Sequence, residues 1–322
     1  MANIVLLGRC NLRCPYCFAE NYTSGENEDI TDGTFWRLLD FAAPDREIGL
    51  IGGEPLLHKN IDTYLDILSD DPRFSHVTVF TNGIFINKHI KSLFNPKIIL
   101  LININSPDDI GRDNFSKINE NIGILSEYGM KECITLGINI YKENQNFDDF
   151  LYLVKKYNFK KVRVSVVISK DKSEAAINYF MRMKKTMFSF YKELAALDIC
   201  PCYDCNAIPE CVYTEEEKAF LSTLPYSNDT ERDIFMGKRS VCSPIIDLYP
   251  DMTASRCFGC SGGPRLKIDD FNNIIDLRNC FFFNTDSILV HTPSRPECED
   301  CYKFKTFSCF GGCLCYKKSA EK

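Results

Sequence analysis

Three cysteines near the start of the 322-residue chain have a spacing suited to metal chemistry. Cys10, Cys14 and Cys17 form the pattern C-x3-C-x2-C. Three thiolates can hold three irons of a 4Fe-4S cube and leave the fourth iron open, and an open position lets a metal centre bind substrate. A structural zinc knuckle is the alternative, but it needs a nearby fourth ligand, and the closest histidine is His58. The spacing therefore favours a reactive iron-sulfur cluster.

Most of the other cysteines lie in the last part of the chain. The sequence holds 17 cysteines, of which 13 lie at or beyond position 200. They include the run Cys298-x2-Cys301-x7-Cys309-x3-Cys313. Small domains of this kind bury little apolar surface and depend on metal ligands to fold. We expect a metal-organised region here, built either on iron-sulfur clusters or on a zinc ribbon.

Composition limits the compartment and the partners. Residues 1–8 (MANIVLLG) lack the features of a signal peptide, and no run reaches the roughly 18 apolar residues of a membrane span. We expect a cytoplasmic protein that binds no membrane, because reducing compartments keep thiols available for metals. A secreted, disulfide-rich protein whose signal has been removed is the alternative. The net charge of −6, without any basic tract, argues against nucleic acid as a partner.

Hydrophobic periodicity indicates the elements that must position these thiols. Apolar runs rich in Ile and Val predict strands at 3–7, 47–51, 76–80, 98–104, 133–140 and 161–168. Amphipathic stretches predict helices near 31–43, 59–69, 86–94, 113–128, 146–157 and 174–197. Continuous apolar strands that alternate with helices indicate a parallel sheet covered by helices. Six such units predict an α/β fold of the TIM-like type, a partial (βα)6 barrel.

Polar and cysteine residues follow the first four predicted strands. Cys10 follows the first strand, Gly52-Gly53-Glu54-Pro55 the second and Thr81-Asn82-Gly83 the third, while Asn103 to Ser106 end the fourth. Because chemistry in parallel α/β folds collects at the carboxyl ends of the strands, we expect these segments to lie together. After about residue 197 regular helices become fewer and cysteines dense. We therefore predict a barrel core at 1–197 and a cysteine-rich domain at 198–322.

The cysteine loop resembles the signature of the radical S-adenosylmethionine (SAM) superfamily. That signature has the same spacing with an aromatic residue before the last cysteine, here Tyr16. The resemblance implies that Cys10, Cys14 and Cys17 are catalytic and hold an oxygen-sensitive 4Fe-4S cluster whose open iron chelates SAM. It also implies that an electron from this cluster cleaves SAM to methionine and a 5′-deoxyadenosyl radical, which abstracts hydrogen from the substrate.

Further residues match positions that bind SAM in that superfamily. Gly52-Gly53-Glu54-Pro55 resembles the GGEP element that hydrogen-bonds the SAM amino group, and Glu54 can accept charge-assisted bonds from an ammonium. Alone, this segment would be an ordinary turn. The resemblance implies ribose contacts at the fourth strand and contacts from later strands that flank SAM. The implied cofactor-binding residues are Tyr16, Gly52, Gly53, Glu54, Pro55, Asn103, Asn105, Ser106, Asn139 and Arg163.

The cysteine-rich region resembles the SPASM extension, which binds auxiliary 4Fe-4S clusters. Cys242 and Cys257 bracket a segment that reads as a strand, a Pro-Asp turn and a strand. The resemblance implies one cluster on Cys242, Cys257, Cys313 and either Cys205 or Cys211, and a second on Cys298, Cys301, Cys309 and Cys315. The chain departs from the pattern at Met252, which replaces a hairpin glycine, in the longer spacer before Cys309, and in the short segment after Cys315. An open iron or a different fourth ligand in the second cluster therefore stays an alternative.

SPASM proteins act mostly on peptides or proteins, so the resemblance implies a peptide substrate. The expected reaction is ribosomal-peptide maturation through a thioether or carbon-carbon crosslink, or epimerisation. A sulfatase-type maturase would carry an aspartate just after the second hairpin cysteine, where this chain has Phe258. Because only nine residues precede Cys10, leader binding would need a separate protein or the auxiliary domain.

Other partners and alternatives complete the expectations. We expect a flavodoxin- or ferredoxin-type electron donor. A small-molecule substrate such as a sugar or amino acid is an alternative to the peptide. Two alternatives outside catalysis are an iron-sulfur electron carrier and a zinc-ribbon interaction module fused to an inactive barrel.

Overall fold

The computed structural model describes residues 1–23, 25, 28–169, 171, 174, 176–203, 205–206, 208–242, 245–258 and 263–317. The chain forms two compact units. Unit 1 comprises Met1–Leu136 and Pro244–Phe281, and unit 2 comprises Gly137–Ser243 and Phe282–Lys322. The expected domain boundary at residue 197 is not a limit of either unit, and it stays a prediction.

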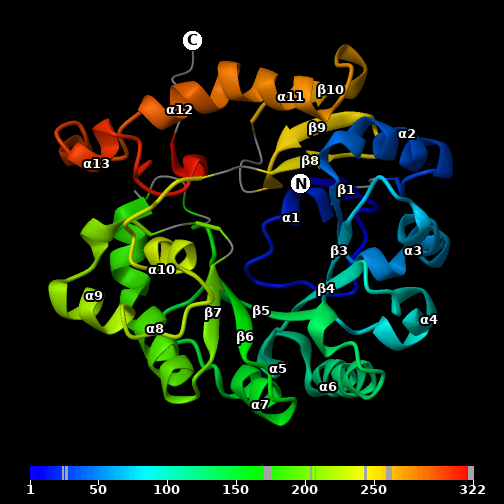
Figure 1. Ribbon diagram of the computed structural model, residues 1–322, viewed down its shortest axis with the longest axis horizontal. Helices are drawn as coiled ribbons and strands as arrows, with labels where there is room; N and C mark the ends of the chain where they lie inside the picture. Colours follow the sequence, from blue (N-terminus) through cyan, green and yellow to red (C-terminus); the bar gives the residue numbers. More distant parts are fainter. Residues whose placement is uncertain are drawn as a thin grey trace. The chain divides into compact units, whose positions relative to one another are not determined.

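Unit 1 is built on a mostly parallel sheet (Figure 1). Its strands follow the order β10-β9-β8-β1-β2-β3-β4. Their bounds are β1 (Ala2–Val5), β2 (Glu47–Ile51), β3 (His76–Thr81), β4 (Ile98–Asn103), β8 (Ile246–Leu248), β9 (Thr253–Arg256) and β10 (Leu266–Lys267). Strands β8 and β1 to β4 are parallel, whereas β9 and β10 are antiparallel to their neighbours. The predicted hairpin β8–β9 therefore extends the sheet beside β1, which the sequence did not indicate.

The two faces of β3 and β4 differ in exposure. Side chains alternate between the faces of a strand. One face is buried core: Val77, Val79, Ile98, Leu100 and Ile102. The other, called here the half-buried face, consists of Thr78, Phe80, Ile99, Leu101 and Asn103. The carboxyl ends of β3 and β4 lie at the edge of the sheet where the sequence analysis expects the cysteine loop.

The helices of unit 1 are α1 (Glu20–Thr23), α2 (Asp32–Ala42), α3 (Ile61–Asp70), α4 (Ile90–Leu93), α5 (Pro107–Ile110), α6 (Arg112–Glu127) and α11 (Ile274–Phe281). Most of them, namely α2, α3, α4, α6 and α11, lie along the outer side of the strands of this unit, whereas α1 lies on the inner side of β1 (Figure 1). Helix α2 begins after Thr31, whose hydroxyl accepts a bond from the Thr34 amide at 3.2 Å. Arg278 of α11 donates to both carboxylate oxygens of Asp45 at 2.6 and 2.7 Å. Both bonds come from Nη2, and this ion pair links α11 to the turn that follows α2.

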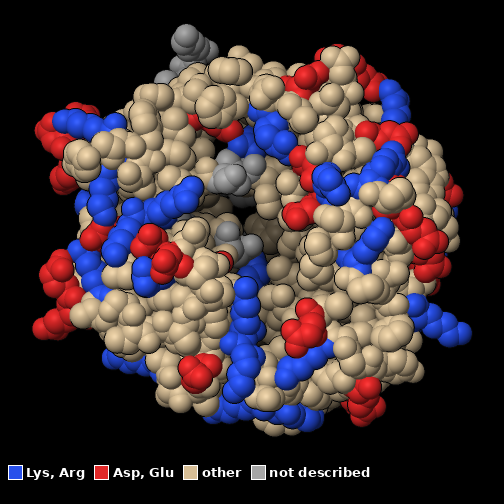
Figure 2. Space-filling model, viewed as in Figure 1, with Lys and Arg blue, Asp and Glu red and all other residues tan. Residues whose placement is uncertain are grey.

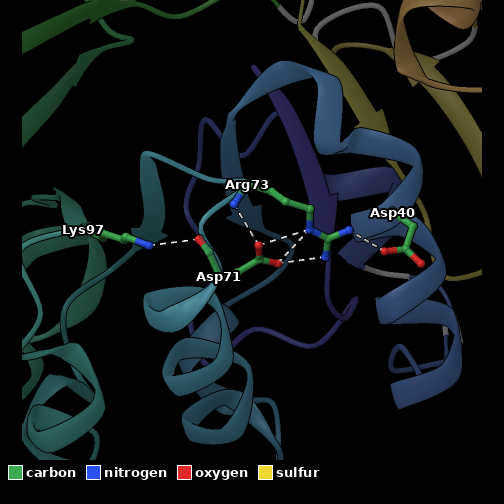
Figure 3. A network of polar contacts seen from close by, with 4 residues as sticks. All are labelled: Asp40, Asp71, Arg73 and Lys97. Carbon is green, nitrogen blue, oxygen red and sulfur yellow. Dashed lines mark hydrogen bonds and ion pairs between the residues drawn. The ribbon is translucent and has the colours of Figure 1, made fainter.

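Arg73 links three further elements of unit 1 (Figure 3). Its guanidinium donates to both carboxylate oxygens of Asp71 and, at 2.6 Å, to Asp40 of α2. The Asp71 carbonyl accepts a bond from Lys97 Nζ at 2.9 Å, just before β4. The network thereby holds the loop after α3 against α2 and against the start of β4.

Unit 2 contains a second set of parallel strands. Strand β5 (Ile134–Ile140) crosses the division between the units, and β6 (Lys161–Val166) pairs in parallel with β7 (Cys200–Tyr203). The helices are α7 (Asp148–Lys156), α8 (Ala176–Ala196), α9 (Glu215–Leu221), α10 (Asp229–Phe235), α12 (Ser287–His291) and α13 (Tyr302–Lys305). Helix α9 starts with a capping box between Thr214 and Glu217.

The predicted α/β class is confirmed, since a mostly parallel sheet with helices is followed by a cysteine-rich region. All six predicted strands form close to their expected bounds, and the helices after residue 197 are short. The stretch predicted to be helical near 86–94 is divided into the 3-10 helix Ile86–Lys88 and α4. His89 lies between the two segments with φ −121°, and its ring contacts Asp62 and the Leu56 carbonyl. Strand β7, which carries Cys200 and Cys202, was not predicted.

The composition predicted that the chain has no basic tract and no membrane-spanning segment. On the face drawn in Figure 2, basic and acidic side chains are interspersed. In the described part of the chain, no helix combines the length and apolar character needed to cross a bilayer. The absence of nucleic acid and membrane partners stays a prediction.

Candidate active site

The cysteine loop and the Gly52–Pro55 turn run side by side at the carboxyl ends of β1 and β2. The Gly53 amide donates to the Leu7 carbonyl at 2.8 Å, and the Glu54 amide donates to the Arg9 carbonyl at 2.9 Å. A Cβ atom on Gly53 would lie 2.0 Å from that Arg9 carbonyl oxygen, so no larger residue fits. The predicted meeting of the two motifs is therefore present, and glycine is what permits it.

The three thiols of the loop belong to no disulfide and influence one another electrostatically. The Leu12 amide donates to Cys10 Sγ at 3.4 Å, and the Cys17 amide donates to the Cys14 carbonyl at 3.1 Å. Burial, with smaller contributions from Cys10 and Cys17, raises the pKa of Cys14 to about 12. Coordination to a metal would reverse this effect, because metals bind thiols as thiolates.

The loop fits an iron-sulfur cluster by its donor chemistry. Three soft sulfur ligands, with an amide directed at one of them, are what such clusters use. Across the described ranges, no three His, Cys, Asp or Glu side chains surround one point closely enough to hold a single metal ion. A four-iron cube binds each thiolate to a separate iron, so that observation concerns single-ion sites.

Glu54 is buried beneath the loop, with 1% of its surface exposed. Its Oε1 accepts bonds from the Leu56 amide at 3.1 Å and the Thr81 hydroxyl at 2.7 Å, and its Oε2 accepts one from the Asn82 amide at 2.8 Å. Burial raises the pKa of Glu54 to about 7, although these three hydrogen bonds act to lower it. Burial also raises the pKa of Cys10, and the Glu54 carboxylate raises it further, so the two groups are close.

Tyr16 connects the cysteine loop to the end of β4. Its hydroxyl donates to Asn105 Oδ1 and accepts a bond from Asn103 Nδ2 at 2.7 Å. Asn105 is buried, whereas Asn103 ends the half-buried face and is partly exposed. Three residues predicted to contact SAM are thus brought together by bonds to one another.

Ser106 has a local structural role. Its hydroxyl accepts a bond from the Asp108 amide at 3.2 Å and caps α5, which begins at Pro107. Serine before proline and acidic residues is a typical helix start, so this role was readable from the sequence. Its predicted ribose contact stays a prediction.

Two site residues were missed by the sequence analysis. Thr81 and Asn82 both donate to Glu54, and Asn82 Nδ2 also donates to Asn11 Oδ1 in the cysteine loop at 2.9 Å. The signal was present, since the polar segment 81–83 was recognised at a strand end. Its partner could be found only from the strand order, which places β3 beside β2.

An apolar cluster covers the other side of the loop. Phe258 and Tyr249 pack with Val5, Ala19 and Ile51, and Cys17 lies against this cluster. The position that would carry an aspartate in a sulfatase-type maturase is therefore part of the apolar core. A carboxylate there would be buried without charge compensation from these neighbours.

In unit 2, Asn139 and Arg163 are neighbours on β5 and β6. Arg163 Nη1 approaches Asn139 Oδ1 at 3.5 Å, and the Asn139 carbonyl accepts a bond from Gln145 Nε2 at 2.9 Å. Both residues lie within strands, as the sequence indicated. Their contact with SAM stays a prediction.

The predicted hairpin is present in unit 1 as β8 and β9. Cys257 follows β9, and its amide donates to the Ile245 carbonyl at 2.9 Å. Met252, which replaces a glycine of the SPASM pattern, has φ +59°, a left-handed conformation that glycine adopts more easily. Cys242 lies in unit 2, and neither cysteine belongs to a disulfide.

The remaining predicted ligands lie in short turns of unit 2. Cys298 ends the 3-10 helix Pro296–Cys298, and Cys301 caps α13. Cys309 and Cys313 are buried in the segment that follows. Upstream, the Ser165 hydroxyl contacts Cys205 Sγ at 3.7 Å.

Cys315 differs from the other predicted ligands. It is disulfide-bonded in this structure. A sulfur in a disulfide is not a thiolate, so Cys315 could ligate a cluster only after reduction of that bond. Its assignment to the second cluster stays a prediction with this added condition.

Several curated relatives resemble parts of the chain. A GTP 3′,8-cyclase of Clostridium perfringens (strain SM101 / Type A) is 27% identical over 153 residues, 46% of this chain and 46% of that protein. The probable GTP 3′,8-cyclase of Archaeoglobus fulgidus is 34% identical over 95 residues, 28% of this chain and 30% of that protein. Molybdenum cofactor biosynthesis protein moc-5 of Caenorhabditis elegans is 24% identical over 253 residues, 77% of this chain and 34% of that protein. The chain spans less than half the length of each relative.

Solved structures share the fold over nearly the whole chain. Native anSMEcpe with bound AdoMet and Kp18Cys peptide has a TM-score of 0.67 at 18% identity, covering 97% of this chain and 88% of that chain. Streptococcus suis SuiB bound to S-adenosylmethionine has a TM-score of 0.59 at 14% identity, covering 94% and 71%. These similarities establish a shared fold.

A family model described as the radical SAM superfamily matches residues 4–167. The matched segment is about half of the 322 residues and contains the cysteine loop, the Gly52–Pro55 turn and the strands that hold them. This chain therefore belongs to the radical SAM superfamily of enzymes.

Proposed function

We propose that Cys10, Cys14 and Cys17 hold a 4Fe-4S cluster beside a SAM site, and that the enzyme modifies a peptide. Membership of the superfamily implies the cluster and SAM as cofactors. When bound, the cluster would supply the electron that splits SAM into methionine and a 5′-deoxyadenosyl radical. Because the superfamily consists of enzymes, the electron-carrier and zinc-ribbon alternatives have less support.

Glu54 is proposed to bind the SAM ammonium. An ionised carboxylate has about four acceptor sites, and three donors already use Glu54. One acceptor site is thus available for an ammonium, whose charge would lower the raised pKa of Glu54 and favour the carboxylate. The three existing bonds fix the carboxylate before SAM arrives.

Tyr16 and its partners are proposed to orient the loop. The partly exposed Asn103 has the better position for a ribose contact, since Asn105 is buried against the Tyr16 hydroxyl. Asn139 and Arg163 are retained as proposed contacts from later strands. Gly52, Gly53 and Pro55 shape the turn that presents Glu54.

The apolar character of the half-buried face carries the choice of substrate class. Phe80 and Leu101 lie opposite each other on β3 and β4, and Ile99 extends the same face. None of the residues in β1 to β4 is Lys or Arg. A peptide side chain can bury apolar surface on such a face, whereas a triphosphate needs cationic partners.

The cysteine-rich region is proposed to be a SPASM-type auxiliary region with two 4Fe-4S clusters. The free thiols between Cys205 and Cys313 support this, as does the likeness to structures that cover 94% and 97% of the chain. One of those structures contains a peptide by name. Ribosomal-peptide maturation, by crosslinking or epimerisation, is the proposed process.

Two protein partners are proposed alongside the peptide. A separate leader-binding protein could present the substrate, and a flavodoxin- or ferredoxin-type donor would deliver electrons. We propose that the enzyme works in the cytoplasm, where such donors and reduced thiols occur together.

A nucleotide substrate is the second candidate, because the sequence relatives are named as GTP 3′,8-cyclases. Their similarity covers only parts of this chain. Sulfatase-type maturation ranks lower, since Phe258 is buried among apolar residues where that activity would require a carboxylate.

Isotope transfer to SAM-derived 5′-deoxyadenosine distinguishes the candidates. The full chain is reconstituted anaerobically with iron and sulfide, reduced with dithionite, and mixed with SAM. Parallel samples receive deuterated peptides encoded by short reading frames beside its gene, or deuterated GTP. Deuterium in deoxyadenosine together with a mass change in a peptide supports the proposal. Transfer from GTP alone, with a cyclised nucleotide as product, would overturn the peptide assignment and support the second candidate.

A further inference from the structure

Three separate segments of unit 2 are tied together around the C-terminal thiols. The Ser240 amide donates to the Ser308 carbonyl at 3.1 Å, and the Phe310 amide donates to the Ser240 carbonyl at 2.7 Å. Lys303 forms an ion pair with Glu210, and its carbonyl accepts a bond from the Cys309 amide at 3.1 Å. Residues 210, 240 and 303–310 are therefore held in one place by bonds that do not involve sulfur.

Gly311 brings two of the thiols to the same point. Its amide donates to Cys309 Sγ at 3.2 Å, and a Cβ atom at this position would lie 3.8 Å from Cys298 Sγ. Gly311 has φ +73°, and its Cβ would also lie 2.3 Å from Ser294 Oγ, so only glycine fits between them. Cys301 follows Cys298 in a tight turn, with its amide donating to the Cys298 carbonyl at 3.1 Å.

Cys211 lies upstream, next to a residue that is bound to the same segment. It directly follows Glu210, the residue bound to Lys303, and lies in the 3-10 helix Glu210–Val212. Partial burial raises the pKa of the Cys211 thiol. The negative charges of Cys309 and Cys298 raise this pKa further, whereas the positive charge of Arg295 lowers it. The ion pair of its neighbour Glu210 with Lys303, whose carbonyl accepts the Cys309 amide, therefore places Cys211 beside the segment that carries Cys301 and Cys309.

A buried cation faces these sulfurs as well. Lys317 is 9% exposed, and its Nζ donates to the Leu289 carbonyl at 2.8 Å. The charges of Cys298, Cys309 and Cys242 act on this ammonium. A buried ammonium needs compensating negative charge, which thiolates bound to a metal cluster would provide.

We infer that Cys211 is the fourth ligand of the cluster on Cys298, Cys301 and Cys309. The inference rests on the auxiliary clusters of the proposed function but changes their ligand sets. Cys205 is then left for the other auxiliary cluster, and Cys315 is not required as a ligand. That division agrees with the disulfide-bonded state of Cys315 and with the electrostatic reach of both Cys205 and Cys313 to Tyr203.

The test uses the full chain with Cys10, Cys14 and Cys17 changed to Ala, so that only auxiliary metal is measured. After anaerobic reconstitution, this background should bind about eight irons in two cubes. Adding Cys211→Ala should lower iron toward about four, or leave a labile cube that gives a three-iron electron paramagnetic resonance signal on oxidation. Cys211→Ser, which offers an oxygen ligand in place of sulfur and nearly keeps the size of the side chain, should retain iron with an altered spectrum.

Two matched variants make the outcome decisive. Cys315→Ala and Cys280→Ala in the same background should leave iron content and spectrum unchanged. Unchanged iron and spectrum in Cys211→Ala, or loss of a cluster in Cys315→Ala, would overturn the inference. If the background binds zinc in place of iron, the auxiliary part of the proposed function fails. The ligand set can then be tested by zinc content. Cys211→Ala should lower the zinc content by one ion, and an unchanged zinc content would show that the inference is wrong.

Discussion

Two groups of thiols in this enzyme are positioned by different means. Cys10, Cys14 and Cys17 follow a strand of a parallel sheet, and amide bonds join their loop to the Gly52–Pro55 turn beside it. Cys298, Cys301 and Cys309 lie in short turns that are held by an ion pair, a single strand bridge and Gly311. The first group follows a strand of a sheet with a buried core, whereas the second lies in turns that are joined by local backbone bonds, one bridge and one ion pair.

This contrast indicates how each site would respond to loss of its cluster. A site on a buried sheet should keep its geometry as an apoprotein, because the sheet is stabilised by its own core. Thiols in turns should lose their arrangement, because ligand binding supplies much of the folding free energy in such regions. The predictions below test this difference, beginning with the largest effect.

Removing metal should affect the two groups unequally. Treating the anaerobic protein with a chelator and reductant should abolish amide hydrogen-exchange protection in residues 298–317, while β1 to β4 stay protected. Hydrogen exchange followed by mass spectrometry measures both regions in one sample. Equal loss of protection in both regions would contradict the comparison.

Glu54→Gln should weaken SAM binding. Loss of the ammonium-carboxylate bond costs about 1.5 to 3 kcal/mol, which corresponds to a roughly ten- to hundredfold higher dissociation constant. The amide would also place a donor opposite the Thr81 hydroxyl or the Asn82 amide, so some stability should be lost as well. Anaerobic titration with SAM at pH 8, with iron measured in parallel, gives both affinity and cluster content.

Thr81→Val is the matched control for that variant, because it removes one donor and keeps the carboxylate. It should lower stability and change SAM affinity much less than Glu54→Gln does. Equal losses of affinity in the two variants would mean that Glu54 acts only through the fold of the turn.

Asp247 gives unit 1 an unusual pH dependence. It is buried on β8, it accepts a bond from Asn3 at 2.8 Å, and burial raises the pKa of Asp247 to about 6. In the unfolded chain an aspartate has a pKa of about 3.9, so it loses its proton at a lower pH than the folded Asp247 does. Between pH about 4 and about 6 the folded state therefore binds more protons than the unfolded state. The free energy of unfolding falls as the pH rises through this range. The stabilising contribution of the protonated group is full below pH about 4 and is lost toward pH about 6.

Replacing Asp247 with Asn should remove this dependence. The difference in free energy of unfolding between variant and wild type should shift in favour of the variant by about 1 kcal/mol from pH 5 to pH 7. Urea unfolding at both pH values measures it. A difference that does not change with pH would show that Asp247 titrates normally.

Met252→Gly should stabilise the hairpin slightly. Residues other than glycine lose roughly 1 to 2 kcal/mol in the left-handed conformation that Met252 adopts, and the greater flexibility of glycine offsets part of that gain. Net stabilisation of up to about 1 kcal/mol should appear in urea unfolding. Met252→Ala, which keeps the backbone conflict, should give no gain, and an equal gain in both variants would assign the effect to the side chain.

The sequence predicted the first group of thiols better than the second for a physical reason. Cys10 and Glu54 are placed by local features, namely apolar strands followed by polar ends, and parallel strand order brings those ends together. The Glu54 donors Thr81 and Asn82 needed the order of β2 and β3. Pairing Cys211 with Cys298 depends on ion pairs and turns between distant segments, which spacing does not encode.

The hairpin shows the same limit. Its two strands and turn were predicted from the segment between Cys242 and Cys257, yet its pairing with β1 joins residues 244 positions apart. Asn3 and Asp247 gave no sign of this contact in the sequence, because each lies in a short strand with no special pattern.

The central claim is that Cys10, Cys14 and Cys17 form the SAM-cleaving site, apart from the other thiols. The most direct measurement is deoxyadenosine formed from SAM by dithionite-reduced, reconstituted protein, compared between wild type and the variant with all three cysteines changed to Ala. The wild type should form deoxyadenosine, and the variant should form none while it keeps about eight auxiliary irons. Deoxyadenosine production that persists in the variant would contradict the account, because another site would then be cleaving SAM.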